Sequence, residues 1–554
     1  MKELLVYIKE YTKECVLGPF FKLLEACFDL AVPLVMASII DKGIALNDKG
    51  YIFKYGGILV LLAIIGLTCS ITAQFFAAKA ATGFAANLRY ALFKHIESLS
   101  FTEMDEIGTS TMITRMTSDI NQLQSGVNMA LRLFLRSPFI VFGAAIMAFT
   151  IDIKAALVFV VVIPLLAVVV FGIMLISMPL FKKVQAGLDD VLGITRQNLT
   201  GVRVIRAFNK EQAELGNFAD ANEKLTVMQL FVGRISALTN PVTYVMVNVA
   251  LLALLWTGGI QVDAGRLTQG EVVALVNYMS QILVELVKLA NTIVLTTKAV
   301  ACGARVQNIL AINSSMEEGD YGEEGNSLAK GGGVEVKFEH VGMKYKGAGG
   351  NSVSDIDFTA MPGSVTGITG GTGSGKSTLV NLIPRFYDAI SGAVLVNGVN
   401  VKEYNQKALR EKIAVAMQKT ELFSGTIKEN ISWGNPDASN DEIKTAAKTA
   451  QADGFINQAE NGYNTSLAEG GMNLSGGQKQ RISIARAILK PCEILVFDDS
   501  TSALDLKTEA DLYNALGKFK HDITKIIVAQ RIASVRQADK IIILDKGRIA
   551  SEIS

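Results

Sequence analysis

Residues 365–387 have the sequence VTGITGGTGSGKSTLVNLIPRFY, which joins a short apolar run to a glycine-rich loop and then to a helix-compatible stretch. The loop fits G-x-x-x-x-G-K-[ST] between a strand and a helix, the context that a phosphate-binding loop requires. Backbone N–H groups of such a loop surround phosphates, and the helix N-terminus adds positive partial charge. We expect Lys376 to reach the β and γ phosphates of a nucleotide and the Ser377 hydroxyl to hold Mg²⁺. The predicted phosphate-binding residues are Gly370, Gly371, Thr372, Gly373, Ser374, Gly375, Lys376, Ser377 and Thr378.

Short apolar runs recur between residues 334 and 554 and alternate with helix-compatible stretches. Such runs are typical of buried parallel strands in an α/β domain. The run at 494–497 is followed by Asp498 and Asp499. A carboxylate at the end of a buried strand can hold the water shell of Mg²⁺ beside a phosphate loop. We therefore predict a phosphate-loop α/β domain over residues 334–554, with Asp498 as a metal ligand.

The first 313 residues carry a different pattern, in which six long apolar stretches are separated by polar segments. A helix needs about 20 mostly apolar residues to cross a hydrocarbon core of about 30 Å. The stretches cover residues 15–40, 55–78, 127–151, 155–180, 237–256 and 272–294. Six buried core helices of a soluble protein would leave too little polar surface. We predict a transmembrane domain of six spans over residues 1–313, followed by an acidic, glycine-rich linker over residues 314–333.

The distribution of charge bears on topology and on partners. Lys and Arg concentrate in two long segments, between the second and third spans and between the fourth and fifth. This bias places both segments and both termini in the cytoplasm of a multi-pass cell-membrane protein. The 554 residues include 53 Lys and Arg against 52 Asp and Glu, a net charge of +1 that gives no electrostatic basis for nucleic-acid binding. The five cysteines show no C-x-x-C spacing, so neither a disulfide framework nor a structural metal site is expected.

A second motif, LSGGQKQR at residues 474–481, carries a family resemblance. Together with the phosphate loop it resembles the nucleotide-binding domain of ATP-binding-cassette (ABC) transporters. Six spans ahead of one such domain resemble a bacterial half-transporter exporter, and the resemblance covers essentially the whole chain. It implies a membrane α-helical bundle with the ABC exporter fold, fused to an α/β P-loop nucleotide-binding domain. It also implies ATP and Mg²⁺ as cofactors, a lipid bilayer, a second half-transporter chain, and a hydrophobic or amphipathic small-molecule substrate.

The resemblance assigns roles to positions that match the family's nucleotide-binding motifs. Tyr345 matches the aromatic residue that stacks on adenine, although an ordinary strand aromatic is the alternative. Gln418 matches the glutamine that touches Mg²⁺ and senses the γ phosphate. In this family the signature loop contacts ATP held by the opposite subunit, and its residues here are Ser475, Gly476, Gly477 and Gln478.

Other matches concern the dimer interface and the coupling between domains. Asp505 matches the aspartate of the dimer interface, and Glu469 lies in a stretch implicated in coupling. Residues 103–108 and 200–208 match the cytoplasmic elbows that dock on nucleotide-binding domains. A solvated helix face is the alternative interpretation of both elbows.

Two positions depart from the family pattern beside the intact phosphate loop. The family has a glutamate that polarises the attacking water where this chain has Asp499, which is one methylene shorter. A misplacement of roughly 1 Å can cost on the order of 100-fold in rate. The family also has a histidine that contacts the γ phosphate where this chain has Gln530, which cannot carry a proton. We expect a catalytic site of Lys376, Asp499 and Gln530 that binds ATP and hydrolyses it slowly.

These departures resemble the degenerate subunit of heterodimeric bacterial multidrug exporters, because LSGGQ is unaltered and would complete the partner's active site. The predicted function is ATP-driven export of a drug-like or lipid-like substrate by a heterodimer. A homodimeric exporter of lipid or peptide with two slow sites is the first alternative. A membrane-anchored NTPase without transport, and a channel or receptor on the same scaffold, are the others.

Ionisable residues inside the predicted spans bear on what is carried. Lys22, Glu25 and Asp29 share roughly one helical face of the first span, and Glu285 and Lys288 stand one turn apart in the sixth. Ionisable groups at membrane depth usually face a bundle interior or a cavity, so these residues could line a substrate path. They could equally form internal pairs that fix helix packing. Both interpretations stay open at the level of sequence.

Overall fold

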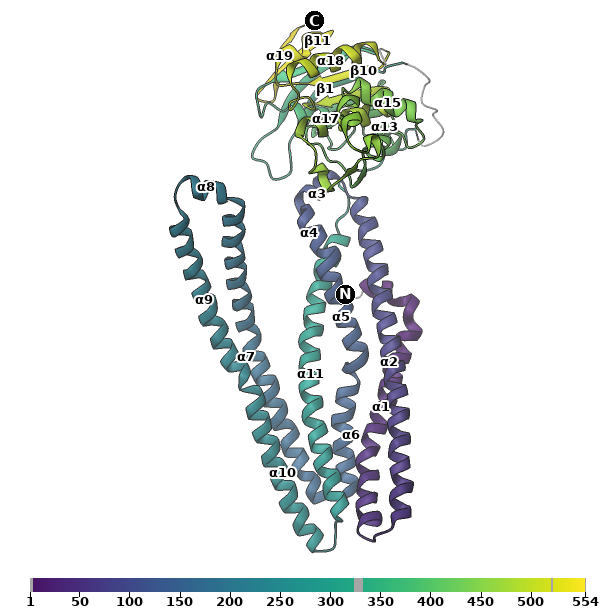
Figure 1. Cartoon of the computed structure of the whole chain (residues 1–554), viewed down its shortest axis with the longest axis vertical. Coiled ribbons are helices and arrows are strands. Elements are labelled where there is room, and N and C mark those ends of the chain that lie inside the picture. The colour runs from purple at the N-terminus through teal and green to yellow at the C-terminus, as the bar shows by residue number, and fades with distance from the viewer. Residues whose placement is uncertain (1–2, 323–331, 520–521, 554) are drawn as a thin grey trace. The chain divides into compact units, whose positions relative to one another are not determined.

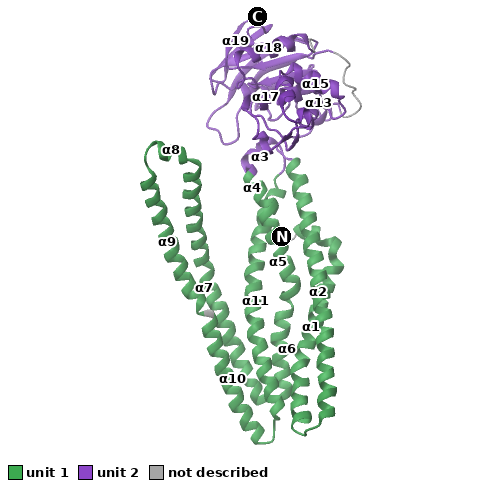
Figure 2. Cartoon of the chain, in the orientation of Figure 1, with its two compact units in different colours: residues 1–97, 110–312 green, residues 98–109, 313–554 purple. Residues whose placement is uncertain are grey.

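The computed structural model describes residues 3–322, 332–519 and 522–553. The chain divides into two compact units, which Figure 2 colours separately. The first comprises residues 1–97 and 110–312, and the second comprises residues 98–109 and 313–554. Within the expected linker, Tyr321 forms an isolated bridge with Tyr404, whereas residues 323–331 lie outside the described residues.

The first unit is built from long helices that extend the apolar stretches of the sequence (Figure 1). The principal helices are α1 (Thr12–Ser38), α2 (Lys49–Glu97), α5 (Ile120–Met129), α6 (Arg136–Ile151), α7 (Ile153–Thr200), α9 (Glu211–Ala237), α10 (Thr239–Asp263) and α11 (Gln269–Leu310). Within the described part of the chain, six continuous helices are long and apolar enough to cross a membrane: Glu3–Ile44, Lys49–Glu97, Thr109–Ile151, Ile153–Thr200, Glu211–Asp263 and Gln269–Leu310. The prediction of six spans is confirmed.

Two of these helices are much longer than a bilayer is thick. α2 has 49 residues and α7 has 48. At 1.5 Å per residue each reaches roughly 70 Å, against about 30 Å for the hydrocarbon core. The short α8 (Val202–Ala207) connects α7 to α9, and these two helices lie side by side with α8 at their tip (Figure 1). The helices therefore continue into both long basic segments.

The second unit contains a mixed six-stranded sheet among its described residues, in the order β12-β11-β3-β10-β9-β6. Only β12 is antiparallel to its neighbour in this sheet. The strands are β3 (Val365–Gly370), β6 (Ile413–Ala416), β9 (Ile494–Asp498), β10 (Thr524–Val528), β11 (Lys540–Asp545) and β12 (Arg548–Ile553). The five parallel strands coincide with apolar runs of the sequence, which confirms the prediction of buried parallel strands.

A second, antiparallel sheet with the order β2-β1-β4-β5 was not predicted. Its strands are β1 (Val336–Met343), β2 (Val353–Ala360), β4 (Ser391–Val396) and β5 (Val399–Asn400). β1 pairs with β2 on one side and with β4 on the other, and both pairings contain register shifts. These interruptions break the regular alternation that would otherwise mark antiparallel strands in a sequence.

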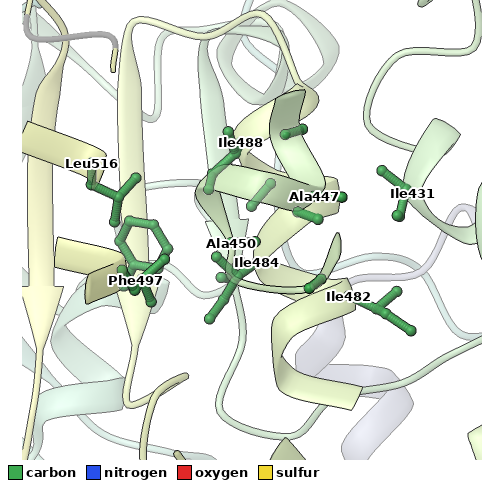
Figure 3. Packing of buried hydrophobic residues seen from close by; sticks show 14 of the residues in the cluster. Ile431, Ala447, Ala450, Ile482, Ile484, Ile488, Phe497 and Leu516 are labelled. Atoms are coloured by element: carbon green, nitrogen blue, oxygen red, sulfur yellow. The ribbon is translucent and has the colours of Figure 1, made fainter. Parts of the chain in front are cut away.

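The core lies on both faces of the parallel sheet. β9 is buried along its whole length, and its neighbours Val496 and Phe497 point to opposite faces, as successive strand residues do. Val496 packs in the cluster that contains Phe338 of β1 and Leu379 of α12 (Lys376–Asn381). Phe497 packs in the cluster of Figure 3, with residues of α14 (Ile427–Ser432), α15 (Asn440–Thr449), α17 (Gly476–Leu489) and α18 (Leu506–Lys518). Residues of that cluster labelled there are Ile431, Ala447, Ala450, Ile482, Ile484, Ile488, Phe497 and Leu516.

The register of the parallel strands brings their carboxyl ends to one edge. Val528 at the end of β10 pairs with Asp498 of β9 and with Ile368 of β3. In open α/β sheets, ligands bind in the crevice outside the carboxyl ends of the strands. The segments that follow β3, β10, β9 and β6 are therefore placed to form a common site.

Candidate functional site

The phosphate loop runs from the end of β3 to the start of α12, and two of its glycines are required by their surroundings. Gly375 has φ +96°, and a Cβ there would lie 2.7 Å from the Ser352 carbonyl oxygen. A Cβ on Gly370 would lie 2.2 Å from the Leu544 carbonyl oxygen. Around Gly371 and Gly373, by contrast, a Cβ would meet nothing within 4 Å. The loop is thus packed against β-structure at both ends and open in the middle.

Lys376 begins α12 with its side chain buried beneath this loop. Its Nζ donates hydrogen bonds to the carbonyl oxygens of Gly370 (2.8 Å) and Gly371 (2.7 Å). Burial lowers the pKa of Lys376 below its usual value, against the opposing effect of the Asp499 and Asp498 carboxylates. The ammonium group is therefore held at the loop by neutral carbonyls, within the field of two carboxylates.

Ser377 and Asp498 meet next to Lys376. The Ser377 hydroxyl donates a hydrogen bond of 2.8 Å to Asp498 Oδ1. Burial raises the pKa of Asp498, although the bond from Ser377 acts in the opposite direction. A hydroxyl and a carboxylate at the end of a phosphate loop are hard oxygen ligands of the kind that Mg²⁺ takes alongside phosphates and waters. The residues present therefore fit Mg²⁺ and a nucleotide phosphate chain.

Asp499 follows β9 in a left-handed conformation with φ +46°. Its Oδ2 accepts hydrogen bonds from Gln530 Nε2 (2.7 Å) and Gln418 Nε2 (3.1 Å). Gln418 follows β6, and Gln530 follows β10. Because an ionised carboxylate only accepts hydrogen bonds, both glutamines turn their amide nitrogen toward Asp499. Asp499 and Gln530, the two positions that depart from the family pattern, are therefore in direct contact.

These groups surround a cavity of about 580 Å³. Nine of the sequence-predicted residues line it: Thr372, Gly373, Gly375, Lys376, Ser377, Thr378, Gln418, Asp499 and Gln530. The sequence did not single out four further lining residues, Asn351, Ser352, Lys546 and Gly547. Lys546 and Gly547 form the turn between β11 and β12, and the Asp-Lys-Gly sequence there indicates a turn but no ligand.

Tyr345 lies beside this cavity and does not line it. Its hydroxyl donates to Thr378 Oγ1 (3.2 Å), and its ring meets the ring of Tyr387 edge to face at 5.1 Å. The aromatic side chain thus borders the phosphate loop through Thr378. Its predicted role in stacking on adenine stays a prediction.

The signature residues lie apart from the chain's own phosphate loop, and none of them lines the 580 Å³ cavity. Ser475 caps α17, since its Oγ accepts from Gln478 N (3.3 Å) while its N–H donates to Gln478 Oε1 (2.9 Å). A Cβ on Gly477 would lie 3.0 Å from the Ala503 carbonyl oxygen. Asp505 caps the following α18 by accepting from Thr508 N (3.0 Å). The signature helix and the Asp505 turn are therefore packed together as one surface.

The first elbow belongs to the second unit, where α3 (Phe101–Ile107) packs on the α/β domain. The Phe101 ring lies 4.9 Å from the Phe386 ring, and the Tyr387 hydroxyl donates to Asp105 Oδ2 (2.6 Å). Lys346 pairs with Glu106 at 2.6 Å. The second elbow, α8, belongs to the first unit, and Glu469 is exposed on the turn at 469–471.

Comparisons with known proteins agree with this architecture. Residues 15–286 match the family described as ABC transporter transmembrane region, and residues 353–502 match that described as ABC transporter. An uncharacterised ABC transporter ATP-binding protein of Mycobacterium tuberculosis is 36% identical over 546 residues, which cover 98% of this chain and 93% of that protein. The ATP-dependent lipid A-core flippase of Hahella chejuensis is 31% identical over 500 residues, which cover 89% of this chain and 84% of that protein.

A solved structure of a bacterial Atm1-family ABC exporter with ATP bound matches with a TM-score of 0.79 and 22% identity. The match covers 98% of this chain and 95% of that one. The predicted fold, a six-span helical domain followed by an α/β P-loop domain, is therefore confirmed.

Proposed function

The chain belongs to the ABC transporter family, as a half-transporter exporter of the cell membrane with a cytoplasmic ATPase domain, and we propose that it works in a heterodimer. Its own phosphate-loop site binds ATP and hydrolyses it slowly, and its signature helix completes the active site of a different partner chain. The cargo is a hydrophobic or amphipathic molecule of drug-like or lipid-like character. The flippase relative, whose name specifies lipid A-core, supports this class of cargo.

The observation that carries the proposal is the contact of Asp499 with Gln418 and Gln530. One oxygen of the carboxylate that should act on water accepts hydrogen bonds from two amides. Both bonds hold that oxygen in place, and neither amide can take up a proton or carry a charge. Asp is also shorter than Glu, so its oxygens lie nearer to the backbone of β9. Gln418 and Gln530 therefore hold the Asp499 carboxylate in place, but they are not the proton-transfer groups that rapid hydrolysis needs.

The other groups of the site include all those expected to bind the phosphates of ATP and Mg²⁺. Lys376 and the loop amides would hold the phosphates, and Ser377 with Asp498, to which it donates a hydrogen bond, would hold Mg²⁺. When bound, ATP with Mg²⁺ would supply the binding energy for closing paired nucleotide domains, and its hydrolysis would supply the energy for reopening them. The capped signature helix supports the second half of the proposal, because Ser475 caps an intact helix and Gly477 allows its close packing against Ala503.

The decisive experiment compares the chain purified alone with the chain co-purified with candidate neighbouring half-transporters. The lone chain is expected to retain labelled ATP and to show little Mg²⁺-dependent turnover. The co-purified complex is expected to turn over ATP. Robust turnover by the lone chain that Asp499→Asn abolishes would favour the homodimer and overturn the heterodimer.

A matched pair of variants tests the signature helix within that complex. Ser475→Ala and Ser439→Ala each remove a side chain that caps a helix through the same pattern of bonds. Both should cost about 1 kcal/mol of stability. Only Ser475→Ala is expected to lower turnover, since Ser439 caps the remote α15. Equal turnover in the two variants would show that this chain's signature does not serve the active site.

Transport itself is tested by ATP-dependent uptake of amphipathic probes into inverted membrane vesicles that contain the complex. Uptake that requires ATP supports an exporter. ATP turnover without uptake of any probe would instead favour a membrane-anchored NTPase.

A further inference from the structure

Four charged side chains from three membrane helices form a continuous chain of contacts in the first unit. α1, α6 and α11 pack against one another (Figure 1). At the start of α6, Arg136 donates from Nη2 to Asp29 Oδ2 of α1 (2.8 Å) and from Nη1 to Glu285 Oε1 of α11 (2.6 Å). One turn later on α11, Lys288 Nζ donates to the same Glu285 oxygen (2.9 Å). The order of contacts is therefore Asp29, Arg136, Glu285, Lys288.

The middle and the ends of this chain differ in exposure. The side chains of Arg136 and Glu285 are 10% and 5% exposed, whereas those of Asp29 and Lys288 are 41% and 45% exposed. Ser137 completes the coordination of Glu285 with a hydrogen bond of 2.8 Å to Oε2. The buried middle is thus paired within the protein, and a carboxylate and an ammonium group remain accessible at its two ends.

The charges of the cluster sum to zero. The four residues contribute two cations and two carboxylates. On α1, Lys22 and Glu25 add one charge of each sign, with Lys22 Nζ 2.5 Å from Glu25 Oε2. Arg136 also lies 3.7 Å from Glu25 Oε1. An additional net charge placed beside the buried middle of this balanced cluster would find its ions already paired within the protein.

A cavity of about 440 Å³ opens beside these groups, within the size range of small-molecule sites. Its lining combines the four charged residues with polar side chains such as Gln281 and with the apolar side chains of Val32, Met36 and Val284. Two buried polar atoms in this lining, Arg136 Nε and Gln281 Oε1, have no hydrogen-bond partner among the described residues. Both atoms have almost no accessible surface, so the charged groups that a ligand in the cavity can reach are the exposed ends of the cluster, Asp29 and Lys288.

We propose that this cavity binds the zwitterionic headgroup of an amphiphilic substrate. The anionic part of the headgroup pairs with Lys288, which gives only one of its three donor hydrogens to Glu285. The cationic part pairs with Asp29, which has a second oxygen beyond the one that accepts from Arg136. The apolar part lies along Val32, Met36 and Val284, which line the same cavity. A zwitterion pairs with both exposed ends of the cluster and leaves the total charge of the site at zero.

That this amphiphile is the transported substrate rests on the proposed export function, whereas its binding requires neither hydrolysis nor a partner chain. Binding is therefore tested on the full chain in a nonionic maltoside detergent, without nucleotide. Three radiolabelled probes share a dodecyl tail and differ in headgroup: dodecylphosphocholine, dodecyltrimethylammonium and the phosphodiester dodecyl methyl phosphate. The wild-type protein is expected to retain the zwitterionic probe at least roughly tenfold better than either singly charged probe.

Two variants that differ in sign sharpen the test. Lys288→Gln leaves the cluster one charge negative and is expected to shift the preference to the cationic probe. Asp29→Asn leaves it one charge positive and is expected to shift the preference to the anionic probe. Lys298→Gln, an exposed lysine on the same helix outside the cavity, is the matched control and should keep the wild-type order.

The wild-type order needs no variant, so the inference can fail even where a variant does not fold. A wild-type preference for a singly charged probe overturns it, and so does an equal loss of all three probes in Lys288→Gln and Asp29→Asn. If the predicted binding order holds but no ATP-dependent uptake is found, the binding site stands and the proposed function fails. If ATP-dependent uptake is found but the binding order is not, the proposed function stands and the proposed binding site fails.

Discussion

Glu285, in the cavity among α1, α6 and α11, accepts hydrogen bonds from two cations, whereas Asp499, at the end of β9, accepts them from two amides. The membrane-domain carboxylate is neutralised by full opposite charges because a bare ion at that depth would be very costly. The carboxylates of the nucleotide site are held by dipoles instead, and Lys376 turns its ammonium group to carbonyl oxygens. In the membrane cluster the charges balance one another within the protein. In the nucleotide site the Lys376 ammonium group has no ion-pair partner in hydrogen-bond contact among the described residues and can pair with a ligand.

The largest effect should follow from removing the cation at the centre of the membrane cluster. Arg136→Met leaves Glu285 and Asp29 without their guanidinium partner and is expected to cost about 3–5 kcal/mol of stability. Lys288→Gln, in which the lost cation is almost half exposed, should cost less than about 1 kcal/mol. Thermal unfolding of the purified chain in detergent measures both. Equal losses in the two variants would contradict the claim that buried charge compensation separates the two regions.

Lys376, the buried cation of the nucleotide site, should matter for ligand binding and little for stability, unlike Arg136. Lys376→Met is expected to weaken ATP binding by roughly 100-fold, because a preorganised cation at the phosphates is lost. It should leave the unfolding temperature nearly unchanged, since its partners are carbonyls and its charged form is already disfavoured by burial. Labelled-ATP binding and thermal unfolding are measured on the same samples. The control is Lys444→Met, on the exposed face of α15, which should bind ATP like the wild type.

Replacing Asp499 and Gln530 by the glutamate and histidine of the family pattern tests whether these two residues limit ATP hydrolysis. The double variant with Asp499→Glu and Gln530→His is expected to raise ATP turnover by roughly tenfold, because the carboxylate gains reach and a neighbour that can carry charge. Steady-state phosphate release measures it. Asp511→Glu, an exposed aspartate of α18, is the control for a longer side chain. Unchanged turnover in the double variant would mean that other features of the site set the rate.

The nucleotide site could be predicted from the sequence because its parts are local. Residues 370–378 form one uninterrupted motif, and Asp499, Gln418 and Gln530 each follow a strand that its own apolar run reveals. Parallel strands bring such segments to one edge of the sheet, so the phosphate loop and Asp498 could be expected to lie together, whereas the roles of Gln418, Asp499 and Gln530 were implied by the family resemblance. Asn351 and Ser352 escaped because they belong to a polar loop before β2, in the antiparallel sheet that the sequence did not predict.

The membrane cluster could be predicted only in part, because its centre depends on contacts between distant helices. Lys22, Glu25 and Asp29 share a face of one helix, and periodicity alone reveals it. Arg136 lies 107 residues from Asp29 and 149 residues from Glu285 along the chain. A single arginine near the start of α6 carries no pattern of its own, so only packing of the three helices identifies it as the common partner. Its position also joins the two interpretations that the sequence left open, since one network both fixes packing and borders a cavity.

The smallest effect concerns the pH dependence of two aspartates of the nucleotide domain that differ only in surroundings. Burial raises the pKa of Asp498, so the folded state holds its proton more tightly than the unfolded chain does. The stability that Asp498 contributes is therefore lost as pH rises through its folded-state pKa. The hydrogen bond from the backbone N–H of Thr508 lowers the pKa of Asp505, so its contribution is present at neutral pH and lost as pH falls through its folded-state pKa.

Asp498→Asn should therefore raise the unfolding temperature at pH 8 by roughly 2 °C, with a smaller gain at pH 5, when measured with EDTA and without nucleotide. Asp505→Asn should lower it at both pH values, since both lie above the range in which that carboxyl titrates. The asparagine at position 498 still accepts the hydrogen bond from Ser377, so only the charge is removed. A shift of the same sign in both variants at pH 8 would show that burial and hydrogen bonding do not distinguish these two aspartates as described.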